Sequence, residues 1–232
     1  MPTILAIETS ADVASAALLH GDRLTVREVT RTTVAQTHSQ TILPLVQTLL
    51  ADAGVRLAQC DAIAFGAGPG SFTGVRTACG VVQGLAFGAQ LPAVSVITLQ
   101  AMAQACREVS GAKDVLAVLD ARMGEVYWAQ YRYVDVWQTV VEPTLSAPED
   151  VAPIGFVIAC GNGLAEYTSV FAGKYFVVDG QPDIMPHAAQ IASLGRIEYN
   201  QHRRLAARDA QPLYLRNKVA LTTIERMAKV AP

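Results

Sequence analysis

A glycine-rich segment is the densest candidate for chemistry in this chain. Residues 68–74 read Gly-Pro-Gly-Ser-Phe-Thr-Gly. Such a loop in front of a helix frees backbone N–H groups, and the helix dipole favours an anion there, so the segment could hold a phosphate. It lacks the lysine of a P-loop and the spacing of a dinucleotide fingerprint. A tight structural turn explains it as well, and the sequence leaves both interpretations open.

Two carboxylates stand at the ends of apolar runs. Glu8 precedes Thr9 and Ser10, and a carboxylate beside two hydroxyls could hold a phosphate or a metal-bound water. A capping and turn arrangement is the alternative. Asp120 is followed by Arg122 and could be catalytic, although a charged turn between two strands explains it equally well.

Histidine spacing argues against a metal centre. A helical metal site would place a second ligand one turn after His38, but Thr41 and Ile42 stand there. We therefore expect His38 to begin a helix or lie at the surface. No Ser-His-Asp or Cys-His set follows from spacing, so no catalytic residue and no metal are assigned. The four cysteines are far apart and suit buried thiols in a reducing compartment.

Composition limits the class of protein. The 232 residues are 51% hydrophobic and 16% charged, enough for a large core and for a sticky exposed face. No apolar run of about 18 residues and no signal peptide is visible, so we expect a cytoplasmic protein without membrane contact. The net charge of −2 argues against a dedicated nucleic-acid binder. Residues 196–232 carry +5, which suits a solvated basic face or an auxiliary contact with RNA or an acidic partner.

The elements that must position these segments form two related α/β halves. In the first half, periodicity predicts strands at 3–8, 14–20 and 24–29, a helix at 37–53, a strand at 62–65, a helix at 75–87, a strand at 93–96 and a further helix. In the second it predicts strands at 115–119, 125–133 and 137–141, a short helix near 148–151, a strand at 156–159, a helix after residues 161–163, a strand at 175–178, and helices at 187–199 and 213–228.

Capping and turn residues refine these boundaries. Gly21-Asp22 is a plausible tight turn, and Gly54 supplies the stop of the helix at 37–53. Pro44 inside that helix implies a kink or a later start. Thr98 is expected to cap the helix that follows the strand at 93–96. The helix at 213–228 is expected to pack back on the first half.

Three glycines form a stripe on the helix at 75–87. Gly80, Gly84 and Gly88 recur every fourth residue, and each costs about 1 kcal/mol relative to alanine in a helix interior. Something must approach that backbone closely. Either this chain's own sheet packs there, or another subunit does.

Taken together, these segments resemble the TsaB (YeaZ) family, in order and over most of the chain. The most specific motifs are GPGSFTG at 68–74, followed by Arg76, and DARMGEVY at 120–127. The supporting motifs are Ile7-Glu8-Thr9-Ser10, His38-Ser39 ahead of Leu43-Pro44, Gly161-Asn162-Gly163, and Pro212-Leu213-Tyr214-Leu215-Arg216.

The resemblance implies an actin-like ATPase fold of two ribonuclease-H-like domains. Their expected ranges are 1–108, joined by a C-terminal helix at 212–232, and 109–211. It also implies a non-catalytic scaffold for TsaD, the paralogue that transfers threonylcarbamoyl to an adenosine adjoining the tRNA anticodon. Catalytic members carry two metal-binding histidines separated by three residues, whereas Ile42 stands at the second place here.

The implied partners are a TsaD-type paralogue, a TsaE-type ATPase in a larger complex, and a second copy when the chain is alone, with tRNA contacted indirectly. No cofactor is expected to bind tightly, and ATP or ADP is expected only in the complex with partners. The expected partner interface consists of His38, Ile42, Leu45, Val46, Leu49, Arg76, Gly80, Gly84 and Gly88. The expected vestigial phosphate loop consists of Thr9, Ser10, Gly68, Gly70, Ser71, Thr73 and Gly74.

The alternative is an autonomous actin-fold ATPase or phosphotransferase that uses Glu8 or Asp120 to hold a magnesium–water. An open groove lined by Thr9, Ser10 and Asp120 would favour it, whereas a cleft closed by side chains would favour the scaffold. A hydrolase would need a nucleophile or metal set that the sequence does not offer.

Overall fold

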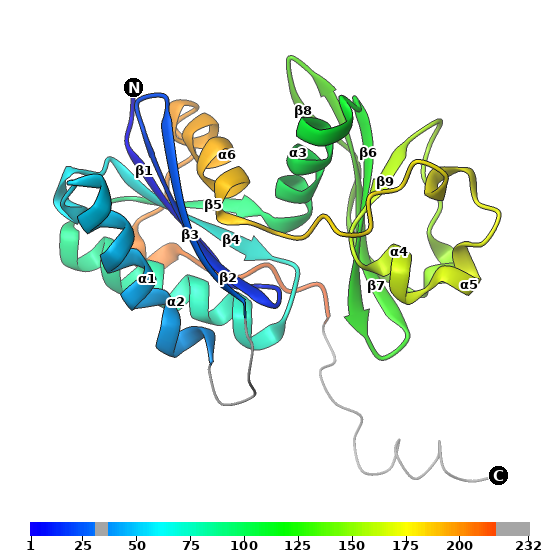
Figure 1. Cartoon of the computed structure of the whole chain (residues 1–232), viewed down its shortest axis with the longest axis horizontal. Helices are drawn as coiled ribbons and strands as arrows, with labels where there is room; N and C mark the ends of the chain where they lie inside the picture. The colour runs from blue at the N-terminus through cyan, green and yellow to red at the C-terminus, as the bar shows by residue number, and fades with distance from the viewer. Residues whose placement is uncertain (31–36, 217–232) are drawn as a thin grey trace, which may run out of the picture.

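The chain folds into two lobes, each built on one sheet (Figure 1). The computed structural model describes residues 1–30 and 37–216. The first sheet consists of β1 (Ile4–Glu8), β2 (Val13–His20), β3 (Arg23–Thr30), β4 (Ala62–Gly68) and β5 (Ala93–Ile97). The second consists of β6 (Asp114–Arg122), β7 (Glu125–Val134), β8 (Val136–Ser146) and β9 (Ile158–Cys160).

The two sheets repeat one strand order. The first runs β3-β2-β1-β4-β5 and the second β8-β7-β6-β9. In each, three successive strands pair antiparallel, and the next strand joins the first of them in parallel. This repeat confirms the doubled α/β architecture expected from the sequence.

Helices cover both faces of the first sheet. The longer ones are α1 (His38–Ala53), α2 (Phe72–Ala89), α3 (Thr98–Ser110) and α6 (Ala188–Asn200), and the short ones are α4 (Gly163–Glu166) and α5 (Thr168–Phe171). Alternate residues of β1 face opposite ways. Leu5 and Ile7 pack in one core with α1 and α2, and Ile4 and Ala6 in another with α6. The first sheet is therefore covered on both faces.

Helix α6 packs on the first lobe although it follows the second lobe in the chain. Ala188, Ile191 and Ala192 share a core with Ile4 and other residues of the first sheet, and α6 lies beside β1 in Figure 1. A Cβ added to Gly195 would come within 2.6 Å of the Ala64 Cβ, so the helix lies directly on the strands. The structure thus moves 188–200 out of the range expected for the second domain.

Several local expectations are wrong. Thr98 does not cap α3, because it is the first helical residue after the cap Ile97, and its Oγ1 accepts a hydrogen bond from the Gly68 N–H at 3.0 Å. Residues Tyr175–Val177 form a 3-10 turn in place of the expected strand. The strand expected at 156–159 is limited to Ile158–Cys160.

Other boundaries extend beyond the predicted ones. Helix α1 begins at His38 and carries Pro44 inside it, so the later start is excluded. Helix α2 begins three residues early, at Phe72, with Ser71 as its cap. Within the described ranges, no helix is long and apolar enough to cross a membrane.

The C-terminal segment is not helical where it is described. Residues 211–216 run without regular secondary structure from the first lobe towards the second, as the orange segment of Figure 1 shows. The remainder of the helix expected at 213–228 lies outside the described residues.

Candidate functional site

A cleft of about 580 Å³ lies between the lobes. The ends of β1 and β6 and the start of α2 meet around it. Its wall combines residues of both lobes and of the C-terminal segment, among them 10–12, 37–39, 69–75, 119–123 and 213–216. The cleft is the only described place where most of the residues singled out by sequence come together, so it is the candidate site.

The glycine-rich loop packs directly on the end of β1. A Cβ added to Gly70 would lie 2.6 Å from the Ser10 Cβ, and one added to Gly74 would lie 2.0 Å from the Thr9 carbonyl oxygen. Real atoms cannot approach so closely, so these positions need glycine whether or not a ligand binds. The turn interpretation therefore has a sufficient physical cause in this chain.

Neither Glu8 nor Thr9 lines the cleft, so of the three residues whose lining would favour a nucleotide enzyme only Ser10 and Asp120 are present there. Glu8 and Thr9 are fully buried. The Thr9 hydroxyl donates to the Gly74 carbonyl at 2.7 Å. One Glu8 oxygen accepts the Ser10 N–H, while Oε2 has no partner among the described residues. Burial raises the pKa of the Glu8 carboxyl, and the Ser10 hydrogen bonds oppose this only in part. Glu8 is thus unsuited to holding a magnesium–water in the cleft.

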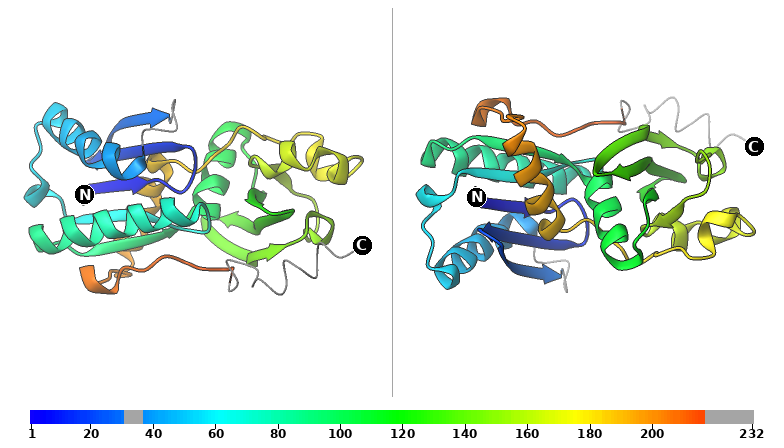
Figure 2. Two further views of the ribbon diagram at one scale, coloured as in Figure 1. Left: turned by 90° about the horizontal axis from the view of Figure 1, so that it is seen from below. Right: turned by 90° about the horizontal axis from the view of Figure 1, so that it is seen from above.

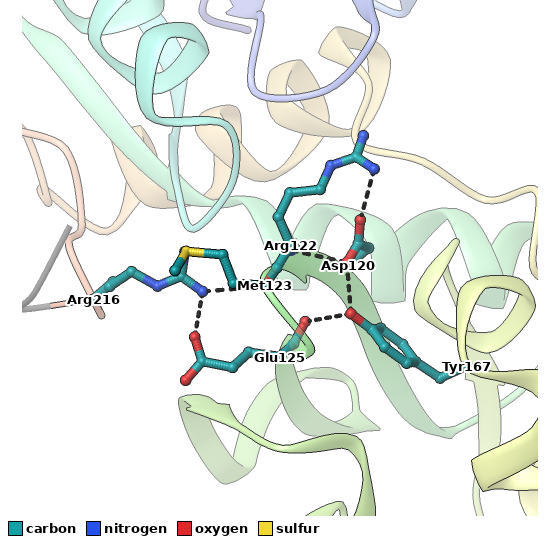
Figure 3. Close-up of polar contacts among 6 residues, drawn as sticks. All are labelled: Asp120, Arg122, Met123, Glu125, Tyr167 and Arg216. Carbon is teal, nitrogen blue, oxygen red and sulfur yellow. Dashed lines mark hydrogen bonds and ion pairs between the residues drawn. The ribbon is translucent and has the colours of Figure 1, made fainter. Parts of the chain in front are cut away.

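Asp120 lies on the second-lobe wall of the cleft with its oxygens already paired (Figure 3). Oδ1 accepts from the Tyr167 hydroxyl at 3.1 Å and from the Arg122 N–H at 2.9 Å, and Oδ2 pairs with the Arg122 guanidinium at 3.2 Å. Burial, together with the bond to Asp120, raises the pKa of Tyr167 to about 12. The Asn162 side chain accepts the Asp120 N–H at 2.9 Å. This arrangement suits the charged-turn interpretation of Asp120.

His38 lines the cleft, but nothing beside it completes a metal site. Its Nε2 donates to the Ala11 carbonyl at 2.8 Å. Ile42, one turn later, is fully buried in the first-lobe core. Among the residues that the structure describes, no group of three or more His, Cys, Asp or Glu side chains could hold a metal ion.

Part of the expected partner interface is wrong. Ile42, Val46 and Leu49 are buried in this chain's own core and cannot contact a partner. Leu45 is partly buried against the same core. Helix α1 instead exposes Leu43, 47% accessible.

The glycine stripe faces outward. Nothing described lies within 4 Å of a Cβ added to Gly80, Gly84 or Gly88, so close packing against this chain's own sheet does not explain the stripe. Arg76 begins the same face of α2, with its guanidinium 3.2 Å from the Phe72 ring centroid and 4.8 Å from that of Tyr214.

Sequence reasoning gave no role to Tyr214 and Arg216, which line the cleft, or to Tyr167, which donates to Asp120. Tyr167 carried no signal, because a single tyrosine after a short helix has no spacing to read. Tyr214 and Arg216 belong to a quoted motif, but only the fold shows Arg216 beside Glu125 of the second lobe (Figure 3).

Comparison with known proteins agrees with the fold and the motifs. A family model described as TsaD, tRNA N6-adenosine threonylcarbamoyltransferase, matches residues 29–217. The tRNA threonylcarbamoyladenosine biosynthesis protein TsaB of Haemophilus influenzae is 38% identical over 94% of this chain and 94% of its own. The chain belongs to the TsaB (YeaZ) family.

Other TsaB proteins show the same relationship. Escherichia coli TsaB is 35% identical over 94% of this chain and 96% of its own length. The solved structure of YeaZ from Pseudomonas aeruginosa superposes with a TM-score of 0.85 at 38% identity, covering 93% of this chain and all of that one. The likeness therefore extends over both lobes.

Proposed function

We propose that this chain works in threonylcarbamoyladenosine biosynthesis as a non-catalytic subunit that binds and supports a TsaD-type transferase. The observation that carries the proposal is the full-length likeness to proteins named for that pathway. Modification of the tRNA adenosine next to the anticodon would then be the reaction of the complex, in the cytoplasm where tRNA is modified.

Three features of the cleft support a silent subunit. Ile42 lies in the core, so His38 has no second imidazole one turn away. Glu8 is buried away from the cleft, and the Asp120 oxygens are held by Arg122 and Tyr167. A catalytic carboxylate needs a free acceptor aimed at the reacting group, and neither of these two offers one.

The outer face of α2 supports a partner interface. Glycines in a helix are destabilising, yet no atom of residues 1–30 or 37–216 lies within 4 Å of a Cβ added to Gly80, Gly84 or Gly88. A helix of a second subunit could approach this backbone closely. We assign the face to a TsaD-type partner, or to a second copy when the chain is alone, with Arg76 at its edge.

Replacing Gly84 with Leu tests this face. The open space around Gly84 leaves the monomer fold intact, while the added side chain separates two close-packed helices. We expect at least a tenfold loss of association, about 1.4 kcal/mol, measured by light scattering on mixtures with the organism's TsaD. Gln47→Leu on exposed α1 is the matched control. Equal association of the Gly84 variant and the control would contradict the assignment.

The pathway itself is tested in cells. Deleting the chain should remove threonylcarbamoyladenosine from tRNA, as measured by nucleoside mass spectrometry, and the wild-type chain should restore it. His38→Ala should restore it equally, because a silent subunit needs no imidazole. Full modification in the deletion strain would refute the proposal. A TsaE-type ATPase and ATP or ADP belong to the larger complex, and tRNA is contacted through the partner.

An autonomous ATPase or phosphotransferase is the second candidate, because the cleft is open and lined by Ser10, the glycine-rich loop and Asp120. At the start of α2 the Ser71 N–H donates to the Ser10 carbonyl and the Gly74 N–H to the Ser71 hydroxyl, which leaves the N–H groups of Phe72 and Thr73 to meet a phosphate. Titration of the isolated chain with ATP and magnesium in a calorimeter distinguishes the two candidates. Stoichiometric binding with turnover would favour the enzyme, and absence of binding would favour the scaffold.

A further inference from the structure

We infer that residues 211–216, here called the strap, clamp the two lobes together across the cleft, with the Arg216–Glu125 ion pair as the closing contact. The strap leaves the first lobe, passes the start of α2 and reaches the β6–β7 turn (Figure 2). Helix α3 packs on residues of both sheets and joins the lobes elsewhere (Figure 1). The strap borders the cleft with residues 213–216, and Met185, in the connection that leads to α6, also lines it.

The strap is attached to the first lobe at two points along its length. At its base, the Ala210 carbonyl accepts from the Gln83 side chain at 2.8 Å and from the Cys79 thiol at 3.2 Å. One step further, the Leu213 N–H donates to the Ala67 carbonyl at 2.7 Å, at the end of β4. These bonds tie the strap to the rigid backbone of the first lobe.

The middle of the strap is held by cation–π contacts. The Arg76 guanidinium lies over the rings of Phe72 and Tyr214, which are tilted by 42° with their centroids 6.4 Å apart. Such contacts add attraction while leaving both rings about half exposed. They hold Tyr214 at the start of α2, from where the chain continues towards the second lobe.

The far end of the strap closes on the β6–β7 turn (Figure 3). Arg216 pairs with Glu125, donates to the Arg122 carbonyl at 3.4 Å and contacts the Met123 sulfur at 3.7 Å. Arg122 and Met123 have φ of 62° and 61°, a conformation that L residues adopt only where neighbours hold it. The Arg216 side chain is 18% exposed and that of Glu125 is 39% exposed, so water and salt screen this contact only in part.

These contacts imply that the two lobes can rotate apart when the Arg216–Glu125 pair is released. The strap is the one described segment that bonds β4 and α2 at one end and β6–β7 at the other, and its residues 213–216 border the cleft. Releasing Arg216 would leave the lobes joined through α3 and through the segment that precedes α6, and would let the cleft widen on the side of the strap. The clamp thus fixes the cleft width, independently of whether the chain serves as a scaffold or as an enzyme.

The test is a distance distribution between the lobes. Spin labels on Gln47→Cys in α1 and Val178→Cys in the second lobe report the separation by pulsed electron resonance, because both positions are exposed and the four native cysteines are buried. We expect a narrow distribution in the labelled parent. We expect at least a doubling of its width, with a shift to longer distance, in Arg216→Ala.

Controls separate the clamp from general destabilisation. Arg203→Ala removes an ion pair that lies within the first lobe, with Glu198, and should keep the parent distribution. Glu125→Gln should broaden the distribution even if Arg216→Ala fails to fold. The exchanged pair Arg216→Glu with Glu125→Arg should restore it. An unchanged distribution in folded Arg216→Ala or Glu125→Gln would overturn the clamp.

Discussion

The first and second lobes end their central strands in different ways. Strand β1 runs into Glu8, which is fully buried and keeps one oxygen without a partner among the described residues. Strand β6 runs into Asp120, whose oxygens are taken by Arg122 and Tyr167. The corresponding strand thus ends in a buried acid with one unpaired oxygen in the first lobe and in a fully paired acid in the second, as far as the described residues show.

The glycine loops, by contrast, do the same work in both lobes. Gly74 passes over the Thr9 carbonyl at the end of β1, and Gly161 and Gly163 pass over Val118 in β6. In each lobe the loop after the parallel strand, β4 or β9, crosses close to the backbone of the neighbouring strand, β1 or β6. A Cβ in the loop would overlap atoms of that strand. Close backbone contact alone therefore requires glycine at these positions, with or without a bound phosphate.

The largest effect is expected from Gly74→Ala. The added Cβ would meet a backbone carbonyl at 2.0 Å, which cannot rotate away. We expect the free energy of unfolding to fall by about 3 kcal/mol, measured by urea denaturation. Gly84→Ala is the matched control, because the same change there meets open space and should raise stability by about 0.5–1 kcal/mol. Similar changes in stability at both positions would contradict the steric requirement for glycine at position 74.

A smaller effect is expected in the second lobe. In Gly163→Ala the new Cβ would lie 2.7 Å from a Val118 methyl and 3.1 Å from its carbonyl oxygen. A side chain can move by a few tenths of an ångström, so we expect a loss of about 1–2 kcal/mol in the same assay. A loss larger than that of Gly74→Ala would reverse the ranking of the two lobes.

Glu8→Gln should give the smallest effect and the most specific one. Because burial raises the pKa of Glu8 above 4.5, the folded state holds the proton more tightly than the unfolded state. The protonated side chain favours folding fully below the unfolded pKa, and this contribution is lost as the pH rises through the folded pKa. Glutamine stays neutral, so the variant should be more stable than the parent at pH 8 and equally stable at pH 4.

The measurement is urea denaturation of parent and variant at both pH values. Asp120→Asn is the control, since its carboxylate is paired and its removal should bring no gain at either pH. A constant difference between Glu8→Gln and the parent across this range would contradict the buried acid.

The sequence predicts the fold well where periodicity and turn residues agree. Strands β1–β3 and helix α1 with its Gly54 stop lie where predicted, whereas the GPGSFTG segment ends in the first turn of α2. Residues 175–178 are apolar enough for a strand, but the second sheet ends at β9 and Tyr175 bonds to the Gly155 carbonyl instead. Local pattern does not reveal whether a neighbouring strand is available.

The candidate site is less predictable than the fold. Ser10 and Gly70 follow the neighbouring strands β1 and β4, so the sequence can place them together, whereas Asp120 reaches the same cleft because the end of β6 in the second sheet faces it. Residue spacing does not show which face of α1 is buried. It therefore predicts a partner interface at Ile42, Val46 and Leu49, which the structure places in the core of the first lobe. Nor does it place Arg216 beside Glu125, 91 residues earlier in the chain.

The return of α6 to the first lobe has a consequence for the order in which the chain is built. The five strands of the first sheet are complete by Ile97, but the helix that covers one of their faces begins only at Ala188. During synthesis the apolar face around Ile4, Ala64 and Val96 waits for the whole second lobe to be translated. Such a delayed long-range contact slows folding and leaves the nascent chain open to aggregation, so the early sheet is the natural client of a chaperone at the ribosome.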